Sequence, residues 1–328
     1  MGMLVEGKWH DVFYDTSGSK GRFIREDAQF RNWITVDGSA GDSGEAGFNA
    51  ESGRYHLYVS LACPWAHRTL MMRSLKGLEA HISVSVVSPI MLEHGWTYHR
   101  DEGSSGDPLH NAEFHHQIYT AAQEDYSGRV TVPVLWDKEQ NTIVSNESSE
   151  IIRMLNEAFN GITGNQDDYY PVALRDQIKQ WNDRIYPAIN NGVYRAGFAT
   201  TQGAYEEAYR TLFDALDDID AHLGSHRYLT GERVTEADIR LFTTLIRFDA
   251  VYHGHFKCNR QRLEDYDHIP GYIRDIYQLP GVADTVDFDH IKTHYNASHR
   301  MINPTGVVPL GPDIDYAHPH GRERLIAA

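Results

Sequence analysis

The chain has 328 residues, of which 41% are hydrophobic and 23% charged, values that are ordinary for a globular protein with room for two domains. Its formal net charge of -16 disfavours nucleic acid and anionic membrane surfaces as partners, because both are held by basic patches. No apolar run approaches the roughly 18 residues that cross a bilayer, and the first residues lack the pattern of a secretory signal. Two cysteines exclude a disulfide framework and predict a reducing, cytoplasmic location.

The first 54 residues are predicted to form an extension wrapped onto the body of the protein. Apolar residues would anchor it, and a loop rich in Gly, Ser and Asp follows at residues 37–53. The anchors are Trp9, Phe13, Phe23, Phe30 and Trp33.

From residue 54 onward, strand and helix patterns alternate. Residues 55–61 are rich in β-branched and aromatic side chains and predict a strand. Pro64 then opens a helix, where its missing N–H does no harm, and Gly77 ends it. The elements predicted next are a buried strand at 82–87, a helix at 111–122, strands at 133–136 and 142–145 around a turn at 137–141, and a helix at 148–155.

The order β-α-β-α-β-β-α predicts an α/β fold with a parallel pair of strands followed by a hairpin. This is a thioredoxin-like arrangement, in which a cis-proline precedes the third strand and faces the start of the first helix. Val132-Pro133 lies at that place in the sequence. We therefore predict a cis peptide bond there.

A polar, Gly-bearing stretch at residues 160–166 is predicted to link two domains, at 1–160 and 161–328. Apolar residues at spacings of three or four run from 205 to 223 and stop at Gly224. Thr235 to Asp238 form a helix-capping pattern in which Asp replaces the usual Glu or Gln. The second domain is therefore predicted to be all-helical.

The candidate nucleophile is Cys63, in the motif Cys63-Pro64-Trp65-Ala66. A thiol at a helix N-terminus faces unpaired N–H groups and the positive end of the helix dipole, which lowers its pKa from ~8.5 to roughly 3.5–7.5. The alternative is a buried cysteine at the end of a strand. Because Ala66 stands where dithiol oxidoreductases have their second cysteine, a mixed disulfide on Cys63 needs an external thiol, and glutathione is the abundant one.

Glu147-Ser148 suits the γ-glutamyl end of glutathione. Ser148 at a helix start can offer its hydroxyl and N–H to the carboxylate, and Glu147 can pair with the ammonium. The Val132 backbone would bond the cysteinyl part as a strand edge does. The alternative is that Ser148 only caps the helix and Glu147 is solvated.

These motifs resemble those of the Xi-class glutathione transferases, the glutathionyl-hydroquinone reductases. The resemblance runs nearly end to end and includes the long extension. The matching motifs are Cys63 to Ala66, Arg129 to Pro133, Ser145 to Ser148, Asn190 to Tyr194, Leu229 to Gly231, Thr235 to Asp238 and Asn303 to Gly306.

The resemblance implies a thioredoxin-like domain, an all-helical glutathione-transferase domain and a homodimer. It implies that Cys63 takes glutathione from a glutathionyl-hydroquinone, that Tyr194 does the acid–base work at the ring carbon, and that Tyr252 and Tyr295 stabilise the thiolate. Glutathione would be a cosubstrate, with no tightly bound cofactor. The residues implied to bind it are Trp96, Arg129, Val130, Thr131, Val132, Pro133, Glu147 and Ser148.

Other readings of the sequence remain open. An Omega-like thiol transferase or dehydroascorbate reductase would need the same thiol but no proton donor to carbon, and a non-catalytic glutathione-binding protein would need neither. Metal binding is the less favoured reading of His253 and His255 near Cys258, and of His290 with His294, and surface or packing histidines are favoured. The second pair has helical spacing for two ligands, but it lacks the Glu of a metalloprotease motif and no third ligand is evident. We predict no metal site and a structural role for Cys258.

Overall fold

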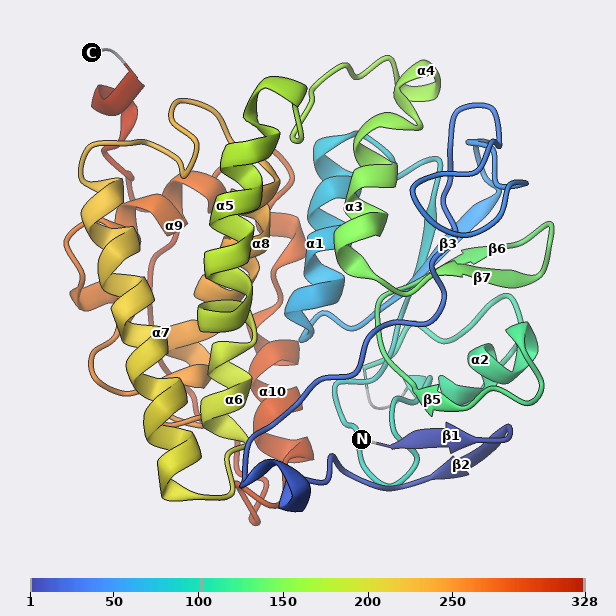
Figure 1. The fold of residues 1–328 in the computed structure, drawn as a ribbon, viewed down its shortest axis with the longest axis horizontal. Helices are drawn as coiled ribbons and strands as arrows, with labels where there is room; N and C mark the ends of the chain where they lie inside the picture. The colour runs from blue at the N-terminus through green and yellow to red at the C-terminus, as the bar shows by residue number, and fades with distance from the viewer. Residues whose placement is uncertain (1, 101–102, 327–328) are drawn as a thin grey trace. The chain divides into compact units, whose positions relative to one another are not determined.

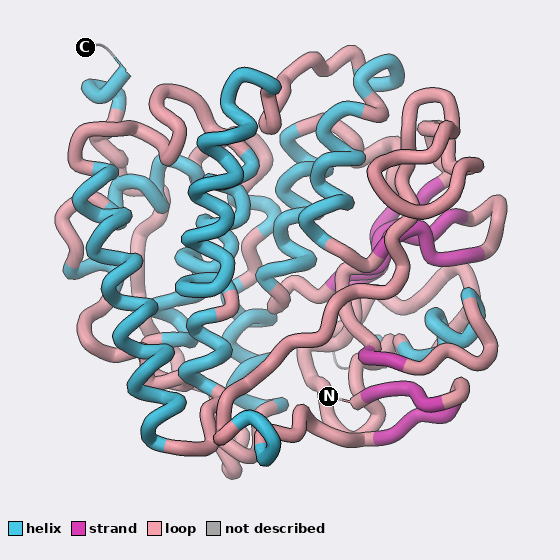
Figure 2. The backbone as a smooth tube through the Cα atoms, viewed as in Figure 1, coloured by secondary structure: helices cyan, strands magenta, loops and turns pink. Residues whose placement is uncertain are grey.

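The computed structural model describes residues 2–100 and 103–326. It divides into two compact units, each built from separate stretches of chain: the described residues among 1–13, 26–167 and 285–308 form the first, and those among 14–25, 168–284 and 309–328 the second. The extension therefore contributes to both units, and a late stretch of chain belongs to the first. All strands shown in Figure 2 lie in the first unit. The single boundary near residue 160 stays a prediction.

A four-stranded mixed sheet forms the core of the first unit, in the order β4-β3-β6-β7. Figure 1 labels β3, β6 and β7 of this sheet. β3 pairs with β4 in parallel and with β6 antiparallel, and β6 and β7 form the predicted hairpin. The thioredoxin-like fold is thus confirmed. Its strands are β3 (Tyr55–Val59), β4 (Ser83–Val86), β6 (Val134–Asp137) and β7 (Thr142–Ser145).

Helices α1, α2 and α3 of the first unit follow the predicted order, whereas α4 and α10 were not predicted for it. α1 and α3 contact each other extensively, whereas α2 contacts β7. The predicted linker is not structureless, because its first residues form the single turn α4 and Gly164 ends that turn in the left-handed conformation. The bounds are α1 (Pro64–Leu75), α2 (His116–Ala122), α3 (Ser148–Glu157), α4 (Asn160–Thr163) and α10 (Phe288–Ser298).

Two sequence predictions in this unit were wrong in detail. The valine-rich strand is only partly buried: β4 lies at the edge of the sheet, with Ser83 exposed, Val84 and Val86 half-buried and Ser85 buried. The helix predicted from residue 111 begins at 116. Before it, the Asp107 carboxylate accepts hydrogen bonds from the N–H groups of Leu109, His110 and Ala112, which hold a turn instead of a helix.

The extension also forms strands that the sequence did not predict. β1 (Met3–Val5) and β2 (Lys8–His10) make a hairpin, and β1 pairs antiparallel with β5 (Gly128–Arg129). Farther on, Asn32 donates to the carbonyl of Val144 at 2.9 Å, so the extension also covers the free edge of β7. Strands of two or three residues show too little alternation for sequence patterns to find.

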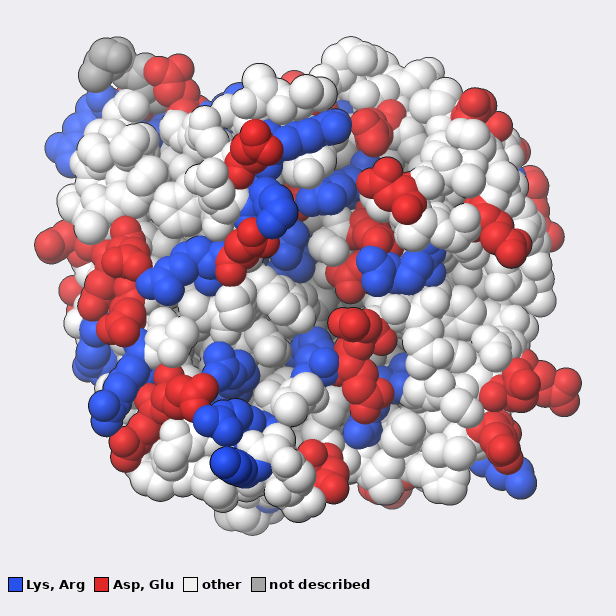
Figure 3. Space-filling view, viewed as in Figure 1, with Lys and Arg blue, Asp and Glu red and all other residues white. Residues whose placement is uncertain are grey.

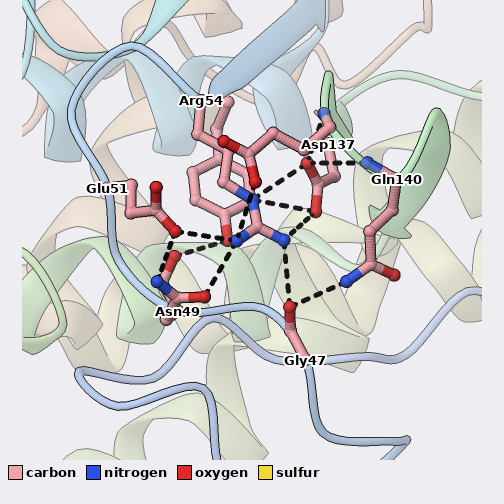
Figure 4. Close-up of polar contacts among 8 residues, drawn as sticks. Gly47, Asn49, Glu51, Arg54, Asp137 and Gln140 are labelled. Carbon is pink, nitrogen blue, oxygen red and sulfur yellow. Dashed lines mark hydrogen bonds and ion pairs between the residues drawn. The ribbon is translucent and has the colours of Figure 1, made fainter.

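A buried arginine fastens the loop of the extension to the sheet (Figure 4). The Arg54 guanidinium donates to both carboxylate oxygens of Asp137 on β6, with contacts of 2.5 to 3.1 Å, and both side chains are at most 5% exposed. It also donates to Asn49, Glu51 and the carbonyl of Gly47. Arg54 therefore neutralises the buried Asp137 carboxylate and links it to the loop.

Replacing Arg54 by methionine is expected to destabilise the protein by about 3 kcal/mol, because it leaves the Asp137 carboxylate buried without its cation. Urea unfolding followed by circular dichroism measures the change. Arg262→Met is the matched control, since the ion pair of Arg262 with Asp265 is solvent-exposed and its loss should leave the unfolding midpoint unchanged. Equal midpoints for the two variants would contradict the prediction.

Two buried histidines make the stability of this unit depend on pH. His56 lies between the hydroxyls of Ser83 and Ser85 at 2.7 and 3.0 Å, and His115 is fully buried. Burial lowers the pKa of each to about 4, from an ordinary value of 6.5. The folded state therefore holds both rings neutral at pH values where the unfolded chain is already protonated.

Stability is expected to be complete above about pH 6.5 and to fall toward pH 4, by up to about 1.4 kcal/mol per pH unit for each ring. Unfolding midpoints measured between pH 7.5 and 5.5 test this expectation, since in that range few carboxylates titrate. His56→Asn should reduce the slope, whereas replacing the exposed His10 by Asn should not. A slope that His56→Asn leaves unchanged would exclude the explanation.

The second unit is helical, as predicted. Its longest helix ends at Gly224, and the predicted cap of α8 is a full capping box in which Asp238 accepts from the Thr235 N–H at 2.9 Å. Two π-helical turns, Tyr186–Asn190 and Phe248–Tyr252, follow α5 and α8. The helices are α5 (Arg175–Ile185), α6 (Gly192–Gly197), α7 (Gln202–Leu223), α8 (Glu236–Arg247) and α9 (Ile269–Tyr277).

The composition predicted neither a nucleic-acid-binding surface nor a membrane-spanning helix, and the structure can be compared with both expectations. On the face shown in Figure 3, basic and acidic side chains are interspersed, so this face carries no extended basic patch of the kind that nucleic acid requires. Among residues 2–100 and 103–326, no helix has both the length and the apolar character to cross a bilayer.

Candidate active site

Cys63 lies where strand β3 gives way to helix α1. It is the N-cap residue of α1, in an extended conformation directly before Pro64, and its carbonyl accepts the first helical hydrogen bond from His67 at 3.0 Å. The first turn of α1 carries no acidic side chain that would oppose a negative sulfur. The sulfur, which is partly buried, therefore lies at the positive end of a 12-residue helix.

The predicted cis peptide bond lies beside this sulfur. Val132-Pro133 is cis, as predicted, and the Cys63 thiol contacts the Val132 carbonyl with an Sγ–O distance of 3.6 Å. The preceding carbonyl, that of Thr131, accepts hydrogen bonds from His115 at 3.0 Å and Tyr119 at 2.9 Å. The backbone before Pro133 is thus fixed from α2 next to the thiol.

The start of α3 presents Glu147 and Ser148. Glu147, and not Ser148, is the N-cap: its carboxylate accepts from the Ser149 N–H at 2.9 Å and from the Ser149 hydroxyl at 2.7 Å. Ser148 is the first helical residue, and its hydroxyl accepts from Arg68 of α1 at 3.3 Å. A carboxylate bound here would meet the N-terminus of a ten-residue helix and a buried guanidinium.

Helix α10 belongs to the first unit and carries Tyr295 there, beside the loop that holds Trp96. The Trp96 indole stacks on His294 with a centroid distance of 4.6 Å, and His294 Nδ1 donates to the Pro89 carbonyl at 2.9 Å. Tyr295 is 1% exposed, and its ring contacts those of His294 and His299. Trp96 is therefore held by the helix that carries Tyr295.

Arg129 fastens the extension. Its guanidinium donates to the carbonyls of Val12 at 2.6 Å and Phe13 at 3.4 Å, and lies 3.6 Å from the Glu26 carboxylate. Val130 follows it, buried. These contacts give the Arg129 side chain a structural role, and its predicted contact with glutathione stays a prediction.

The other two predicted tyrosines belong to the second unit. Tyr194 on α6 and Tyr252 at the end of a π-helical turn are 7% and 0% exposed, with ring centroids 6.0 Å apart. The Arg25 guanidinium lies over the Tyr194 ring at 5.2 Å, and Phe256 contacts both phenol rings. The second unit thus gathers two of the three predicted tyrosines in one aromatic cluster.

Two family models match the chain. The one described as glutathione S-transferase, N-terminal domain, matches residues 62–158, and the one described as glutathione S-transferase, C-terminal domain, matches residues 202–275. Glutathionyl-hydroquinone reductase YqjG of Escherichia coli strain K12 is 58% identical over 324 residues, covering 98% of this chain and 99% of that protein. Glutathionyl-hydroquinone reductase PcpF of Sphingobium chlorophenolicum is 51% identical, covering 95% and 96%.

Solved structures agree with these relatives. The glutathione-bound structure of YqjG has a TM-score of 0.91 at 56% identity, covering 98% of this chain and 99% of that one, and a Xi-class glutathione transferase from Natrialba magadii has a TM-score of 0.90 at 48% identity, covering 99% and 97%. The chain belongs to the Xi class of glutathione transferases. The resemblance drawn from the sequence motifs is therefore confirmed, as is the division into thioredoxin-like and helical parts.

Two of the histidines that suggested a metal site, His290 and His294, have other contacts in this Xi-class transferase. His290 lies 3.5 Å from the Ser60 hydroxyl, His294 bonds the Pro89 carbonyl, and burial lowers the pKa of His255 to about 4. Within the described part of the chain, no three His, Cys, Asp or Glu side chains are grouped as metal ligands would be. Cys258 is fully buried and burial raises the pKa of its thiol, which fits a structural residue.

Several residues around the predicted glutathione-binding segments were not found from the sequence. Arg68, His115, Tyr119 and Asn146 contact those segments, but single arginine, histidine, tyrosine and asparagine residues in helices and loops carry no pattern. Asn146 had one usable signal, since it immediately precedes Glu147 in a matching motif. The others act through contacts between residues far apart in the chain.

Proposed function

We propose that this protein is a glutathione-dependent enzyme that reduces glutathionyl-hydroquinones to hydroquinones. The observation that carries the proposal is the position of Cys63 at the N-terminus of α1 with Ala66 three residues later, so that one nucleophilic thiol has no resolving partner in its motif. The relatives named glutathionyl-hydroquinone reductases align with the whole chain and support the substrate class.

In the first step, the Cys63 thiolate attacks the glutathione sulfur of the aryl thioether. A Cys63–glutathione disulfide forms, the bond between that sulfur and the ring carbon breaks, and the ring carbon takes a proton. In the second step, a glutathione thiolate attacks the mixed disulfide, which releases glutathione disulfide and restores the Cys63 thiolate. Overall, the aryl carbon–sulfur bond is replaced by carbon–hydrogen, and the thioether sulfur and the sulfur of one glutathione thiol become the disulfide.

The remaining assignments follow the resemblance. Tyr194 would supply the proton to the ring carbon, and Tyr252 and Tyr295 would stabilise the thiolate. Trp96, the segment from Arg129 to Pro133, Glu147 and Ser148 would bind glutathione, the cosubstrate. The Val132 backbone beside Cys63, the α3 N-terminus at Ser148 and the stacked Trp96 support this set.

For assembly and location, we propose a homodimer in the cytoplasm. Neither Cys63 nor Cys258 forms a disulfide, which suits a reducing compartment. Light scattering after size-exclusion chromatography tests the dimer, since a 37.4 kDa chain predicts a particle of twice that mass.

The experiment that tests the proposed function combines turnover with mass spectrometry. Glutathionyl-menadiol and excess glutathione should give hydroquinone and glutathione disulfide in equal amounts. With limiting glutathione, a glutathione adduct should accumulate on Cys63 and disappear when glutathione is added. If the adduct forms and exchanges, and dehydroascorbate is reduced, but no hydroquinone is released, the Omega-like alternative is favoured. If no adduct forms on Cys63, a non-catalytic binding protein is favoured.

A further inference from the structure

The hydroxyl of Tyr119 on α2 lies among the segments proposed to bind glutathione. It donates to the Thr131 carbonyl at 2.9 Å, and it accepts from the Thr131 N–H at 3.2 Å and from the Asn146 side-chain amide at 3.1 Å. Thr131 precedes the Val132 backbone that contacts Cys63, and Asn146 precedes Glu147. One hydroxyl therefore joins the cis-proline segment to the start of α3.

The Thr131 hydroxyl also lies 3.2 Å from the Tyr119 oxygen, so four polar neighbours share the one donated and two accepted bonds that a phenol can make. Tyr119 is 0% exposed, and burial raises its pKa, so the phenol keeps the proton that it donates. His115 reinforces the same carbonyl: its ring is neutral because burial lowers its pKa to about 4, so Nδ1 accepts from the Tyr98 hydroxyl while Nε2 donates to Thr131. The Thr131 carbonyl is fixed from two sides.

Asn146 carries this connection to the extension. Its side-chain oxygen accepts from the Phe30 N–H at 3.2 Å, and its own N–H donates to the Phe30 carbonyl at 3.2 Å. The Phe30 ring contacts the rings of Tyr119 and Tyr126, with centroid distances of 6.0 and 5.4 Å. The next residue, Arg31, forms an ion pair with Glu150 in the first turn of α3.

We propose that Tyr119 is a positioning residue for glutathione binding. Together with Asn146, and with Phe30 from the extension, Tyr119 holds the Val132 backbone and the start of α3 in the geometry that binds glutathione. The inference rests on the proposed glutathione site, and it gives the extension a role in binding. Tyr119 itself touches neither the sulfur nor the ring carbon in this scheme. Its loss should therefore weaken binding of the ground state and the transition state alike, which raises KM and leaves kcat unchanged.

The test replaces Tyr119 by phenylalanine in the full-length chain, which removes only the hydroxyl. Binding is measured by calorimetry with S-methylglutathione, a thioether analogue of glutathione without a free thiol. We expect Kd to rise about 5- to 10-fold, because the Thr131 N–H and the Asn146 amide lose their acceptor and the segment before Val132 loosens. KM for glutathionyl-menadiol should rise by a similar factor, with kcat within about twofold of the unchanged protein.

Tyr55→Phe is the matched control. Tyr55 is also 0% exposed, and its hydroxyl donates to a backbone carbonyl, that of Asn49, at 2.7 Å, but it lies at the opposite end of β3 from Cys63. Tyr55→Phe should lower the thermal midpoint comparably without changing Kd. Equal Kd values for the two variants, or a loss of kcat with unchanged KM in Tyr119→Phe, would overturn the proposal.

Asn146→Ala provides a second variant, which removes the side-chain hydrogen bonds to Phe30 and Tyr119 and stays informative if Tyr119→Phe does not fold. It should also raise Kd for S-methylglutathione. The double variant should lose less binding free energy than the sum of the losses in the two single variants, because both side chains act on the same segment. Strict additivity would contradict a shared role. If the unchanged protein binds S-methylglutathione but does not turn over glutathionyl-menadiol, the proposed function is wrong. This inference is then still decided by comparing the Kd values of the variants.

Discussion

Replacing Cys63 by serine is expected to lower turnover of glutathionyl-menadiol by on the order of 10³-fold or more, and to abolish the glutathione adduct. The reason is chemical: only a thiolate can form the mixed disulfide, and a serine hydroxyl at the same helix end stays protonated at neutral pH. Binding of S-methylglutathione should persist in this variant, because the backbone beside Val132 and the start of α3 are unchanged. Turnover, mass spectrometry and calorimetry on one preparation separate these effects.

Cys258→Ala is the control for this prediction. Cys258 is fully buried with a raised thiol pKa, so the variant should keep turnover within about twofold of the unchanged protein, after allowance for some lost stability. Iodoacetamide at pH 7 should label Cys63 and leave Cys258 unmodified in the folded protein. If turnover survives in Cys63→Ser, or if iodoacetamide labels Cys258 before Cys63, then Cys63 is not the nucleophile.

The thiol site could be predicted from the sequence because its signals are local. A strand, a cysteine, a proline and a helix follow one another within about twenty residues, and Val132-Pro133 has a fixed place in that fold. The caps of α1 and α8 were predictable for the same reason, since Pro64, Gly77 and the Thr235 capping box act within single turns. In each case the residue type alone indicates the local conformation, because proline, glycine and a capping threonine each suit one position at a helix end.

What the sequence did not predict depends on contacts between distant residues. Arg54 meets Asp137 from 83 residues away, and Tyr119 meets Asn146 from 27. Among 19 tyrosines nothing distinguishes Tyr119, because its role arises from the carbonyl and amide that the fold brings to it. The return of α10 to the first unit was also missed, since chain order alone assigned it to the helical domain.

The extension shows the same limit. Its apolar residues predicted anchoring, and Phe23 and Trp33 are buried, but polar contacts that the sequence did not predict add to it: Arg129 holds the carbonyls of Val12 and Phe13, and Asn146 holds both backbone groups of Phe30. Backbone groups are present in every residue, so their partners leave no trace in composition or periodicity. Only the folded structure shows that the extension is fastened beside the segments proposed to bind glutathione.

Tyr194→Phe is expected to separate carbon protonation from sulfur chemistry. Hydroquinone release from glutathionyl-menadiol should fall by roughly 10²- to 10⁴-fold, the contribution typical of a positioned acid or base, because phenylalanine offers the ring carbon no proton. Exchange with hydroxyethyl disulfide, in which no carbon is protonated, should stay within about twofold. The aromatic cluster around Tyr194 includes Tyr252 at 6.0 Å and Phe256 at 5.5 Å, and phenylalanine should preserve that packing.

Tyr209→Phe serves as its control, since Tyr209 lies half-buried on α7 against Phe213 and has no part in the proposed chemistry. The ratio of the two activities decides the role of Tyr194. A selective loss of hydroquinone release identifies a proton donor, because general packing damage would lower both reactions together. Parallel losses in Tyr194→Phe would reduce Tyr194 to a structural residue, and unchanged rates on both substrates would require that the proton reach the ring carbon from another group.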